Sequence, residues 1–357
     1  MVTVIVSILV FGFIIFIHEF GHYITARMFN VTIQEFSIGM GPRLFSWVSK
    51  KTNIKYSIAL LPIGGFVAMP GENGEYNDEN SSNDDYSDDP NTFGKKPSWQ
   101  RFIITAAGAT VNIVAGFLAM IILTCCINIG NTKVAVFHDE EELGMPVLSQ
   151  STGLQVDDVI LEINGKKVRI ADELSYQIMR HGNKPVDILV LRNGEEQLIE
   201  DVEFPIGSSQ GQDFGVMDFK VRRVDKNIGS VLKYSYRKAF LIIRMCWESI
   251  YDLIRGRYTF AAVSGPVGIS SAIGNAAKQS FLNLLYIVIL ISINLGVMNL
   301  LPIPALDGGR LLTIIIEMIT RKKLPAKVEG AINAVGLAVL LGLSVIVMIK
   351  DVFQLVF

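Results

Sequence analysis

Residues 2–29 read VTVIVSILVFGFIIFIHEFGHYITARMF, an apolar run interrupted by His18, Glu19 and His22. A helix needs about 20 apolar residues to cross a bilayer, and this run is longer. It lacks the basic first segment and the small-residue cleavage site of a signal peptide. Ionisable residues inside a bilayer are costly unless they line a wet or metal-filled cavity. The stretch therefore predicts a membrane-spanning helix that carries chemistry.

The three polar residues form the pattern His-Glu-x-x-His over residues 18–22. Residues four apart lie on the same face of a helix, so both imidazoles can reach one metal ion. Glu19 stands beside them, where it can accept a proton from a metal-activated water. The alternative, a polar patch satisfied by neighbouring helices, is disfavoured by the cost of placing such groups in lipid.

A catalytic zinc ion takes three protein ligands and keeps one position open for water. His138 and His181 lie in a segment of soluble character and are poor candidates for the third ligand. Residues 299–309 read NLLPIPALDGG, where two prolines break the helix and two glycines allow close backbone approach. A lone carboxylate at a broken intramembrane helix, here Asp307, is expected to be functional. The alternative is that Asp307 caps a helix over residues 310–320.

The composition agrees with a membrane protein. Half of the 357 residues are hydrophobic, 18% are charged and the mean hydropathy is +0.41. Further apolar runs over about 102–127, 281–301 and 331–349 bring the predicted spans to four. The net charge of −2 gives no indication of a nucleic-acid partner. The three cysteines fit neither a disulfide framework nor a CxxC metal site, and we expect them to be buried small side chains.

The loop between the first two spans has two parts. Residues 54–69 alternate apolar and small residues around Gly64-Gly65, which predicts short strands joined by a turn. Residues 71–92 are crowded with Glu, Asp, Asn and Ser, which predicts a flexible linker. A metal-buffering acidic tract is the less favoured interpretation of that composition.

Residues 131–218 have the composition of a soluble α+β module. The pattern predicts a strand at 159–163, a helix at 171–179 and a hairpin with a primed turn at 192–195. Residues 232–254 mix apolar and basic residues, which predicts an amphipathic helix at the membrane surface. A helix that packs on the soluble module is the alternative.

Basic residues predict the orientation of the chain. They are concentrated in the loop at 321–327 and in the first loop over 43–101, which places both loops in the cytoplasm. Four crossings then place both termini and the soluble module outside the cytoplasm.

The motif at 18–22, taken with NLLPIPALDGG at 299–309, closely resembles the site-2 protease family of intramembrane zinc metalloproteases. Within that family the chain is similar to the bacterial RseP-like branch with a single PDZ domain. GGFV at 64–67 resembles the membrane-associated β-loop of that branch, and WQRF at 99–102 resembles the start of its second transmembrane helix. SGPVGI at 264–269 resembles its motif before the third span.

The resemblance implies one Zn²⁺ per chain, held by His18, His22 and Asp307, with Glu19 as general base and acid. It implies that Asn299 holds the substrate backbone or the oxyanion, a task for which an amide near the metal is chemically suited.

The resemblance also implies that the β-loop adds a strand to an unwound substrate helix. A plain structural hairpin is the alternative. Asn112 matches a family position, although a helix–helix hydrogen bond would explain it equally well. The expected substrate-binding residues are Gly64, Gly65, Phe66, Val67, Asn112, Pro302 and Pro304.

Residues 153–165 resemble part of a PDZ domain, with Asp157 where a glycine commonly precedes the aspartate. No clear carboxylate-binding glycine loop precedes them, so we favour a size filter over peptide binding for this module. The expected fold is a polytopic α-helical membrane protein with a β-loop and one extracytoplasmic α+β PDZ-like domain. Its predicted parts are the first span (1–29), β-loop region (30–70), acidic flexible linker (71–98), second span (99–128), PDZ-like domain (131–220), amphipathic or interfacial helix region (228–275), third span with the broken helix (281–320) and fourth span (328–352).

The function that the resemblance implies is cleavage of single-span membrane proteins inside the bacterial inner membrane, with anti-sigma factors or remnant signal peptides as examples. The expected partners are transmembrane substrates and the lipid bilayer, without nucleic acid. A silent membrane scaffold and a zinc transporter are the rival classes, and the intact Glu19 and the broken helix at Asn299 speak against them. A membrane protease of prenylated proteins would be expected to use a Glu as its third ligand, which Asp307 disfavours.

Overall fold

The computed structural model describes residues 2–72, 89–209, 212–257 and 264–356. The chain divides into two compact units, one made of residues 1–119 and 263–357 and the other of residues 120–262. Most of the acidic tract, which we interpret as a linker, lies outside the described residues. Each unit is described by itself below.

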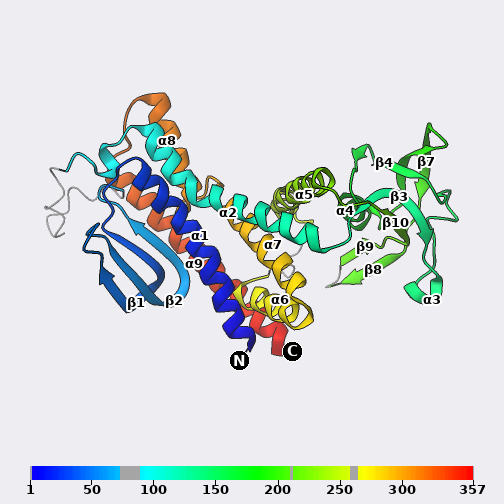
Figure 1. The fold of residues 1–357 in the computed structure, drawn as a ribbon, viewed down its shortest axis with the longest axis horizontal. Coiled ribbons are helices and arrows are strands. Elements are labelled where there is room, and N and C mark those ends of the chain that lie inside the picture. Colours follow the sequence, from blue (N-terminus) through cyan, green and yellow to red (C-terminus); the bar gives the residue numbers. More distant parts are fainter. Residues whose placement is uncertain (1, 73–88, 210–211, 258–263, 357) are drawn as a thin grey trace. The chain divides into compact units, whose positions relative to one another are not determined.

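Four helices of the described chain are long and apolar enough to cross a membrane, as the sequence predicts. They are α1 (Val2–Met28), α2 (Ser98–Cys126), α7 (Phe281–Asn299) and α9 (Ala326–Val356), drawn in Figure 1. The helix α7 ends at Asn299 because Pro302 and Pro304 follow closely and cannot continue it.

Glycines let the helices of the first unit approach one another closely. A Cβ atom on Gly21 of α1 would lie 2.7 Å from the carbonyl oxygen of Ala107 in α2. A Cβ atom on Gly296 of α7 would lie 2.7 Å from the carbonyl oxygen of Ala109. Small residues at such crossings favour packing in membranes, where no hydrophobic effect drives helices together. The backbone of α2 therefore lies directly against both α1 and α7.

Two long bent strands, β1 (Glu35–Val48) and β2 (Lys55–Ala68), form a small sheet next to α1. Each strand bends, so that its two halves pair separately. The four halves lie side by side in the order 43–48, 55–59, 35–38 and 65–68. The bends use glycines with positive φ, including Gly39 (89°) and Gly64 (80°). Among the described residues, the half at 65–68 pairs on one side only, so the sheet ends there in an unpaired edge.

The motif at 264–269 forms the start of α6 (Pro266–Gln279). The carboxylate of Asp351, near the end of α9, accepts the backbone N–H groups of Gly265 and Gly268 at 2.9 and 2.8 Å. An anion at a helix N-terminus satisfies amides that have no partner within the helix. This contact fastens the end of α9 to α6.

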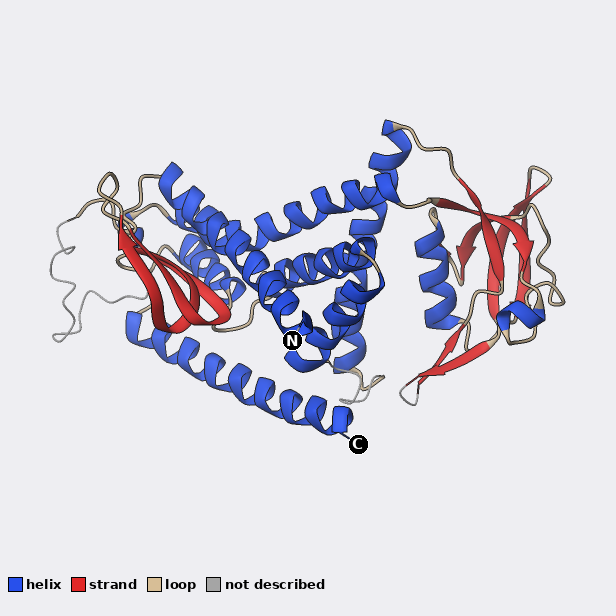
Figure 2. Ribbon diagram, turned by 60° about the horizontal axis from the view of Figure 1, so that its bottom comes forward, coloured by secondary structure: helices blue, strands red, loops and turns tan. Residues whose placement is uncertain are grey.

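The second unit is built around a mixed helix and sheet core, and its strands are drawn in red in Figure 2. The main sheet has the order β10-β3-β4-β6-β7, with β5 paired to β4. Its elements are β3 (Gly130–Phe137), α3 (Glu140–Leu143), β4 (Val159–Ile163), β5 (Lys166–Lys167), α4 (Ala171–His181), β6 (Val186–Arg192), β7 (Glu195–Val202), β8 (Ile206–Ser209), β9 (Gln212–Gly215) and β10 (Phe219–Arg223).

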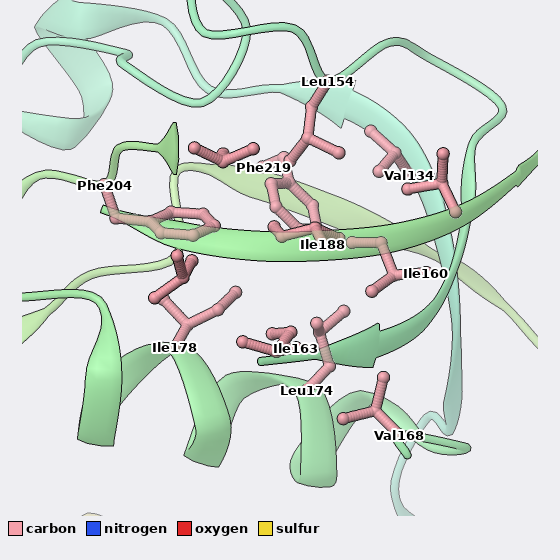
Figure 3. Packing of buried hydrophobic residues seen from close by; sticks show 13 residues of the cluster. Val134, Leu154, Ile160, Ile163, Val168, Leu174, Ile178, Ile188, Phe204 and Phe219 are labelled. Atoms are coloured by element: carbon pink, nitrogen blue, oxygen red, sulfur yellow. The ribbon is translucent and has the colours of Figure 1, made fainter. Parts of the chain in front are cut away.

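The core of this unit packs one face of α4 onto the sheet. Figure 3 shows Leu174 and Ile178 of α4 facing Ile163, Ile188 and other side chains of the strands, all of them fully buried. The predicted strand at 159–163 is confirmed. The predicted hairpin is confirmed as β6 and β7, and its turn residues Asn193 and Gly194 have φ of 54° and 91°, as a primed turn requires.

Residues 232–254 belong to α5 (Ile228–Ile254), which packs against α4. Arg180 of α4 forms an ion pair with Asp252 at 2.6 Å, and the hydroxyl of Tyr176 donates a hydrogen bond to Glu248 at 2.7 Å. Burial, together with the Glu248 carboxylate, raises the pKa of Tyr176, which keeps that hydroxyl protonated and donating. The alternative of a packing helix is thus confirmed.

The same helix leaves an apolar stripe exposed along its other face, which consists of Leu232, Tyr236, Phe240, Trp247 and Tyr251. Aromatic residues of this kind are enriched at membrane interfaces. The stripe is therefore compatible with the predicted surface position as well.

The expectation of buried cysteines is wrong for two of the three. Cys125 and Cys126 are exposed, and Cys246 is half-buried. The pair lies at the last turn of α2, and an apolar run at the end of a span need not be covered by protein. All three thiols are free of disulfides.

Candidate metal centre

The chemistry of the first unit is concentrated on one face of α1. His18, Glu19 and His22 are buried there, each with 8–9% of its surface exposed. The two Nε2 atoms of the histidines lie 3.3 Å apart, as expected for residues one helical turn apart. Asp307 approaches from the distant part of the chain, and its Oδ2 atom lies 3.2 Å from His18 Nε2 and 3.3 Å from His22 Nε2.

These three atoms have the spacing of ligands around one ion. With zinc–ligand bonds of about 2.0–2.1 Å, the corners of a coordination tetrahedron lie about 3.3–3.4 Å apart. The three observed separations of 3.2–3.3 Å fall close to that spacing. Asp307 Oδ2 is also buried and accepts no well-formed hydrogen bond from any residue that the structure describes. Two imidazoles and a carboxylate are a donor set that zinc commonly takes, so the site fits the metal.

The outer nitrogen of each imidazole has a partner on α2. His22 Nδ1 lies 2.8 Å from the carbonyl oxygen of Ile104, which can only accept, so Nδ1 carries the proton and Nε2 is left with its lone pair for a metal. This hydrogen bond fixes both the tautomer and the ring orientation of His22.

Asn112 plays the same part for His18. The Asn112 amide lies 3.3 Å from His18 Nδ1, and the residue is fully buried. The oxygen Oδ1 has no partner as the amide is oriented, and the nitrogen Nδ2 faces Nδ1. With the amide oxygen and nitrogen exchanged, His18 Nδ1–H donates to Oδ1, and His18 Nε2 is free for a metal. Asn112 is thus placed behind the first histidine, where it orients the ring.

Glycines bring the remaining parts of the site together. A Cβ atom on Gly108 of α2 would overlap the His22 ring, so only glycine fits there. A Cβ atom on Gly308 would overlap the carbonyl oxygen of Leu301, and one on Gly309 would lie 2.5 Å from that of Ile303. The two glycines after Asp307 therefore allow the first turn of α8 (Asp307–Thr320) to lie on the loop that follows α7.

The interpretation of Asp307 as a helix cap is wrong. The N-cap residue of α8 is Leu306, with no capping side chain, and Asp307 is the first residue inside the helix. Its carboxylate is directed at the two histidines instead. The negative charge of Asp307 still lies in the first turn, where the helix dipole favours an anion.

A polar cavity of about 350 Å³ opens at the three candidate ligands and Glu19. Residues 65–69, which include the unpaired edge of the sheet, form one side of it. Gly65 lies so close to Glu19 that a Cβ atom there would be 2.8 Å from Glu19 Cγ. The edge of the sheet therefore runs directly past the expected general base, because residue 65 has no side chain.

Four further residues line this cavity without having been singled out from the sequence. They are Gln34, Glu72, Thr105 and Arg310. Arg310 could have been recognised, because it lies three residues after Asp307 and that spacing places two residues on the same face of a helix. The others carry no local signal.

Some of the expected substrate-binding residues lie elsewhere. Asn299 is half-buried at the end of α7 and is not among the residues that line the cavity. Pro302 and Pro304 lie in the loop that supports α8, and Gly64 lies in the bend before the edge strand. Gly65, Phe66 and Val67 line the cavity.

Comparison with known proteins identifies the family. The model of peptidase family M50 matches residues 6–343. The chain belongs to peptidase family M50.

Relatives that match along nearly the whole chain carry names of proteases. A Clostridium acetobutylicum protein described as a zinc metalloprotease is 33% identical over 351 residues, which cover 98% of this chain and 97% of the relative. The regulator of sigma-W protease RasP of Bacillus subtilis is 27% identical over 431 residues, covering 99% of each chain. The zinc metalloprotease RasP of Bacillus licheniformis is 28% identical over 428 residues, covering 99% of each chain. This M50 peptidase is accordingly a zinc metalloprotease of the site-2 protease family, and its spans make it an integral membrane protein.

Proposed function

We propose that this M50 peptidase hydrolyses peptide bonds within or near the transmembrane helices of single-span membrane proteins. The observation that supports the proposal is the position of the candidate ligands. His18 and His22 lie on α1, a helix long and apolar enough to span a bilayer, and their cavity is bordered by an unpaired strand edge. Such a cavity suits a substrate that enters from within the membrane.

In this proposal His18, His22 and Asp307 hold one zinc ion. Zinc, when bound, supplies a Lewis acid that polarises a carbonyl and lowers the pKa of water. Glu19 accepts the proton of the attacking water and returns it to the leaving nitrogen of the cleaved bond. Its place in the wall of the cavity, one residue from His18, suits both tasks. The amide of Asn299 is proposed to hold the substrate backbone or the oxyanion at the end of α7.

The strand edge at 65–68 is proposed to bind the substrate backbone. A transmembrane helix hides its carbonyl groups in intrachain hydrogen bonds, so a segment must be extended before water can attack it. An edge strand offers a row of N–H and C=O groups to an added strand. Phe66, which is 38% exposed, lines the cavity and is positioned to contact side chains of the added strand. Val67, the next residue, belongs to the buried core on the other face of the sheet.

The second unit is proposed to act as a PDZ-like size filter on the extracytoplasmic side. Asp157, which takes the place of a glycine in the resemblance, has a φ of 75°, a conformation that favours glycine. In that conformation the carboxylate of Asp157 forms ion pairs with Lys133 and Arg222. Between α4 and β9, a Cβ atom on Gly215 would lie 2.5 Å from the carbonyl oxygen of Ile178, so little room is left there for a peptide. This close packing supports a filter over a peptide-binding groove.

The proposed substrates are membrane proteins already trimmed outside the membrane, such as anti-sigma factors or remnant signal peptides. The name of the Bacillus subtilis relative, a regulator of sigma-W, points to the first class.

The test is the substitution Glu19→Gln in the full-length protein in liposomes, with a single-span model substrate. We expect cleavage to fall by at least about 10²-fold, the lower range for general acid–base catalysis, while bound zinc per chain stays the same. Unchanged cleavage would overturn the proposed role of Glu19. A wild-type protein that binds the substrate without cleaving it would favour the scaffold, and zinc flux into the liposomes would favour the transporter.

A further inference from the structure

The chain turns sharply where it leaves the edge strand. Residues 69–72 read Met-Pro-Gly-Glu, and the N–H of Glu72 donates to the carbonyl oxygen of Met69 at 3.2 Å. Gly71 has a φ of 76°. Proline followed by a glycine with positive φ is the pattern of a type II turn. The turn directs Glu72 back toward the cavity, whose wall it joins together with the edge strand.

Glu72 meets Arg310 in that wall. The guanidinium of Arg310 donates to the Glu72 carboxylate, and the two side chains are 25% and 18% exposed. Arg310 lies one helical turn after Asp307 on α8, so the two side chains project from the same face. One turn of α8 thus carries both Asp307, the candidate metal ligand, and Arg310, which pairs with Glu72.

These contacts fix the edge strand relative to the metal centre at two points. At its start, Gly65 packs against Glu19, and just after its end, Glu72 is paired with Arg310. The ion pair joins residues 238 positions apart in the sequence. It connects the segment that follows the strand edge to the helix of Asp307.

We propose that Arg310 and Glu72 are positioning residues that set the register of the substrate strand across the metal centre. The inference rests on the proposed function, in which the substrate pairs with residues 65–68. A slip of one residue along a strand moves a peptide bond by about 3.3 Å and exchanges the side-chain faces. Misplacement by about 1 Å can cost 10²-fold in rate, so the strand edge must be held firmly.

A second ion pair on the same helix provides a matched control. Glu317 of α8 pairs with Arg101 at the start of α2 at 2.5 Å, and these side chains are 14% and 11% exposed. The pair has the same chemistry as Arg310 and Glu72 and comparable burial. Neither residue lines the cavity at the candidate ligands.

The test compares Glu72→Gln, Arg310→Lys and the double variant Glu72→Gln/Arg310→Lys with Glu317→Gln, all in the full-length protein in liposomes. The readouts are kcat, KM, zinc per chain and the cleaved bonds identified by mass spectrometry. We expect the first three variants to lower kcat by roughly 10–100-fold, to cleave neighbouring bonds as well, and to keep their zinc. We expect Glu317→Gln to lower thermal stability while the cleaved bond stays the same.

Five outcomes distinguish the possibilities. Additional cleaved bonds in the Glu72 and Arg310 variants alone would support the inference, as would a double variant no worse than either single one. Unchanged cleavage sites and kcat in those variants, beside an active wild type, would overturn it and leave the proposed function standing. Loss of zinc in Arg310→Lys would overturn it as well, because the residue would then support the metal site itself. A wild type without any cleavage would overturn the proposed function.

Discussion

At the scale of single residues, the candidate metal centre depends on residues that supply no metal ligand themselves. The carbonyl of Ile104 and the amide of Asn112 hold the outer nitrogens of the two imidazoles. Gly108 leaves the space that the His22 ring occupies. All three come from α2, so this helix orients the two histidines that α1 supplies.

The amide of Asn112 gives the first prediction. Asn112→Ala removes the acceptor for His18 Nδ1–H, and we expect zinc affinity or activity to fall about 10–100-fold, as for other partners of ligating histidines. Zinc affinity is measured by competition with a chelator. Asn112→Asp keeps an acceptor and should retain more of the affinity than Asn112→Ala. An Asn112→Ala variant with wild-type zinc affinity would show that the amide only joins helices.

The second prediction concerns two glycines in spanning helices. Gly108→Ala places a methyl group against the His22 ring, so we expect loss of bound zinc and of cleavage. The matched control is Gly12→Ala in α1, where no atom lies within 4 Å of the added methyl group. That control should leave activity intact and stabilise the helix by up to about 1 kcal/mol. Equal zinc content in both variants, measured by elemental analysis, would contradict the prediction.

At the scale of elements, α4 and α5 are held together by buried charge. Arg180 and Asp252 have side chains that are 8% and 5% exposed, and the Arg180 Nη1 atom lies 2.6 Å from Asp252 Oδ2. Lys238 and Tyr234 of α5 both reach Asp172 at the start of α4. Such contacts specify one way of packing α5, because each partner is costly to leave unpaired in a buried place.

The third prediction tests that contact. Arg180→Met leaves Asp252 buried without its cation, and we expect the unit at 120–262 to lose about 3–5 kcal/mol of unfolding free energy. The double variant Arg180→Met/Asp252→Leu removes both charges and should recover much of the loss. Thermal unfolding and hydrogen exchange of α5 in detergent give the measurement. A double variant as unstable as Arg180→Met would refute the explanation.

At the scale of the whole molecule, the basic residues and the position of the motif on α1 point to the same side of the membrane. His22 lies six residues before the end of α1 at Met28, a rise of about 9 Å along a helix. The loops that follow α1 and α8 carry the basic clusters, which favour the cytoplasm. We therefore propose that the metal centre lies near the cytoplasmic side and that residues 131–220 lie outside.

The fourth prediction concerns this orientation. The native cysteines are first replaced by serine, and Lys166→Cys or Lys322→Cys is introduced at an exposed position. A membrane-impermeant maleimide should label Lys166→Cys in intact spheroplasts of the expression host and leave Lys322→Cys unlabelled until the membrane is permeabilised. Labelling of Lys322→Cys from outside would reverse the proposed topology.

The sequence by itself determined the features that depend on neighbouring residues. The four spans follow from length and apolarity, and the spacing of His18 and His22 follows from one helical turn. The primed turn at 192–195 follows from Asn-Gly. A carboxylate at a broken apolar helix is costly, so the sequence points to Asp307 as functional, and the structure brings it to the two histidines.

Only the tertiary structure decided the contacts between distant residues. Asn112 lies 94 positions from His18, and either a catalytic or a helix-packing role suited its sequence until α2 was placed against α1. Glu72 belongs to no motif, and its partner Arg310 became evident only when the turn at 69–72 met α8. The exposure of Cys125 and Cys126 cannot be predicted from the sequence for the same reason, since burial depends on what packs against a helix end. The chemistry of a side chain limits the roles that a residue can have, and its contacts with distant residues decide which role it has.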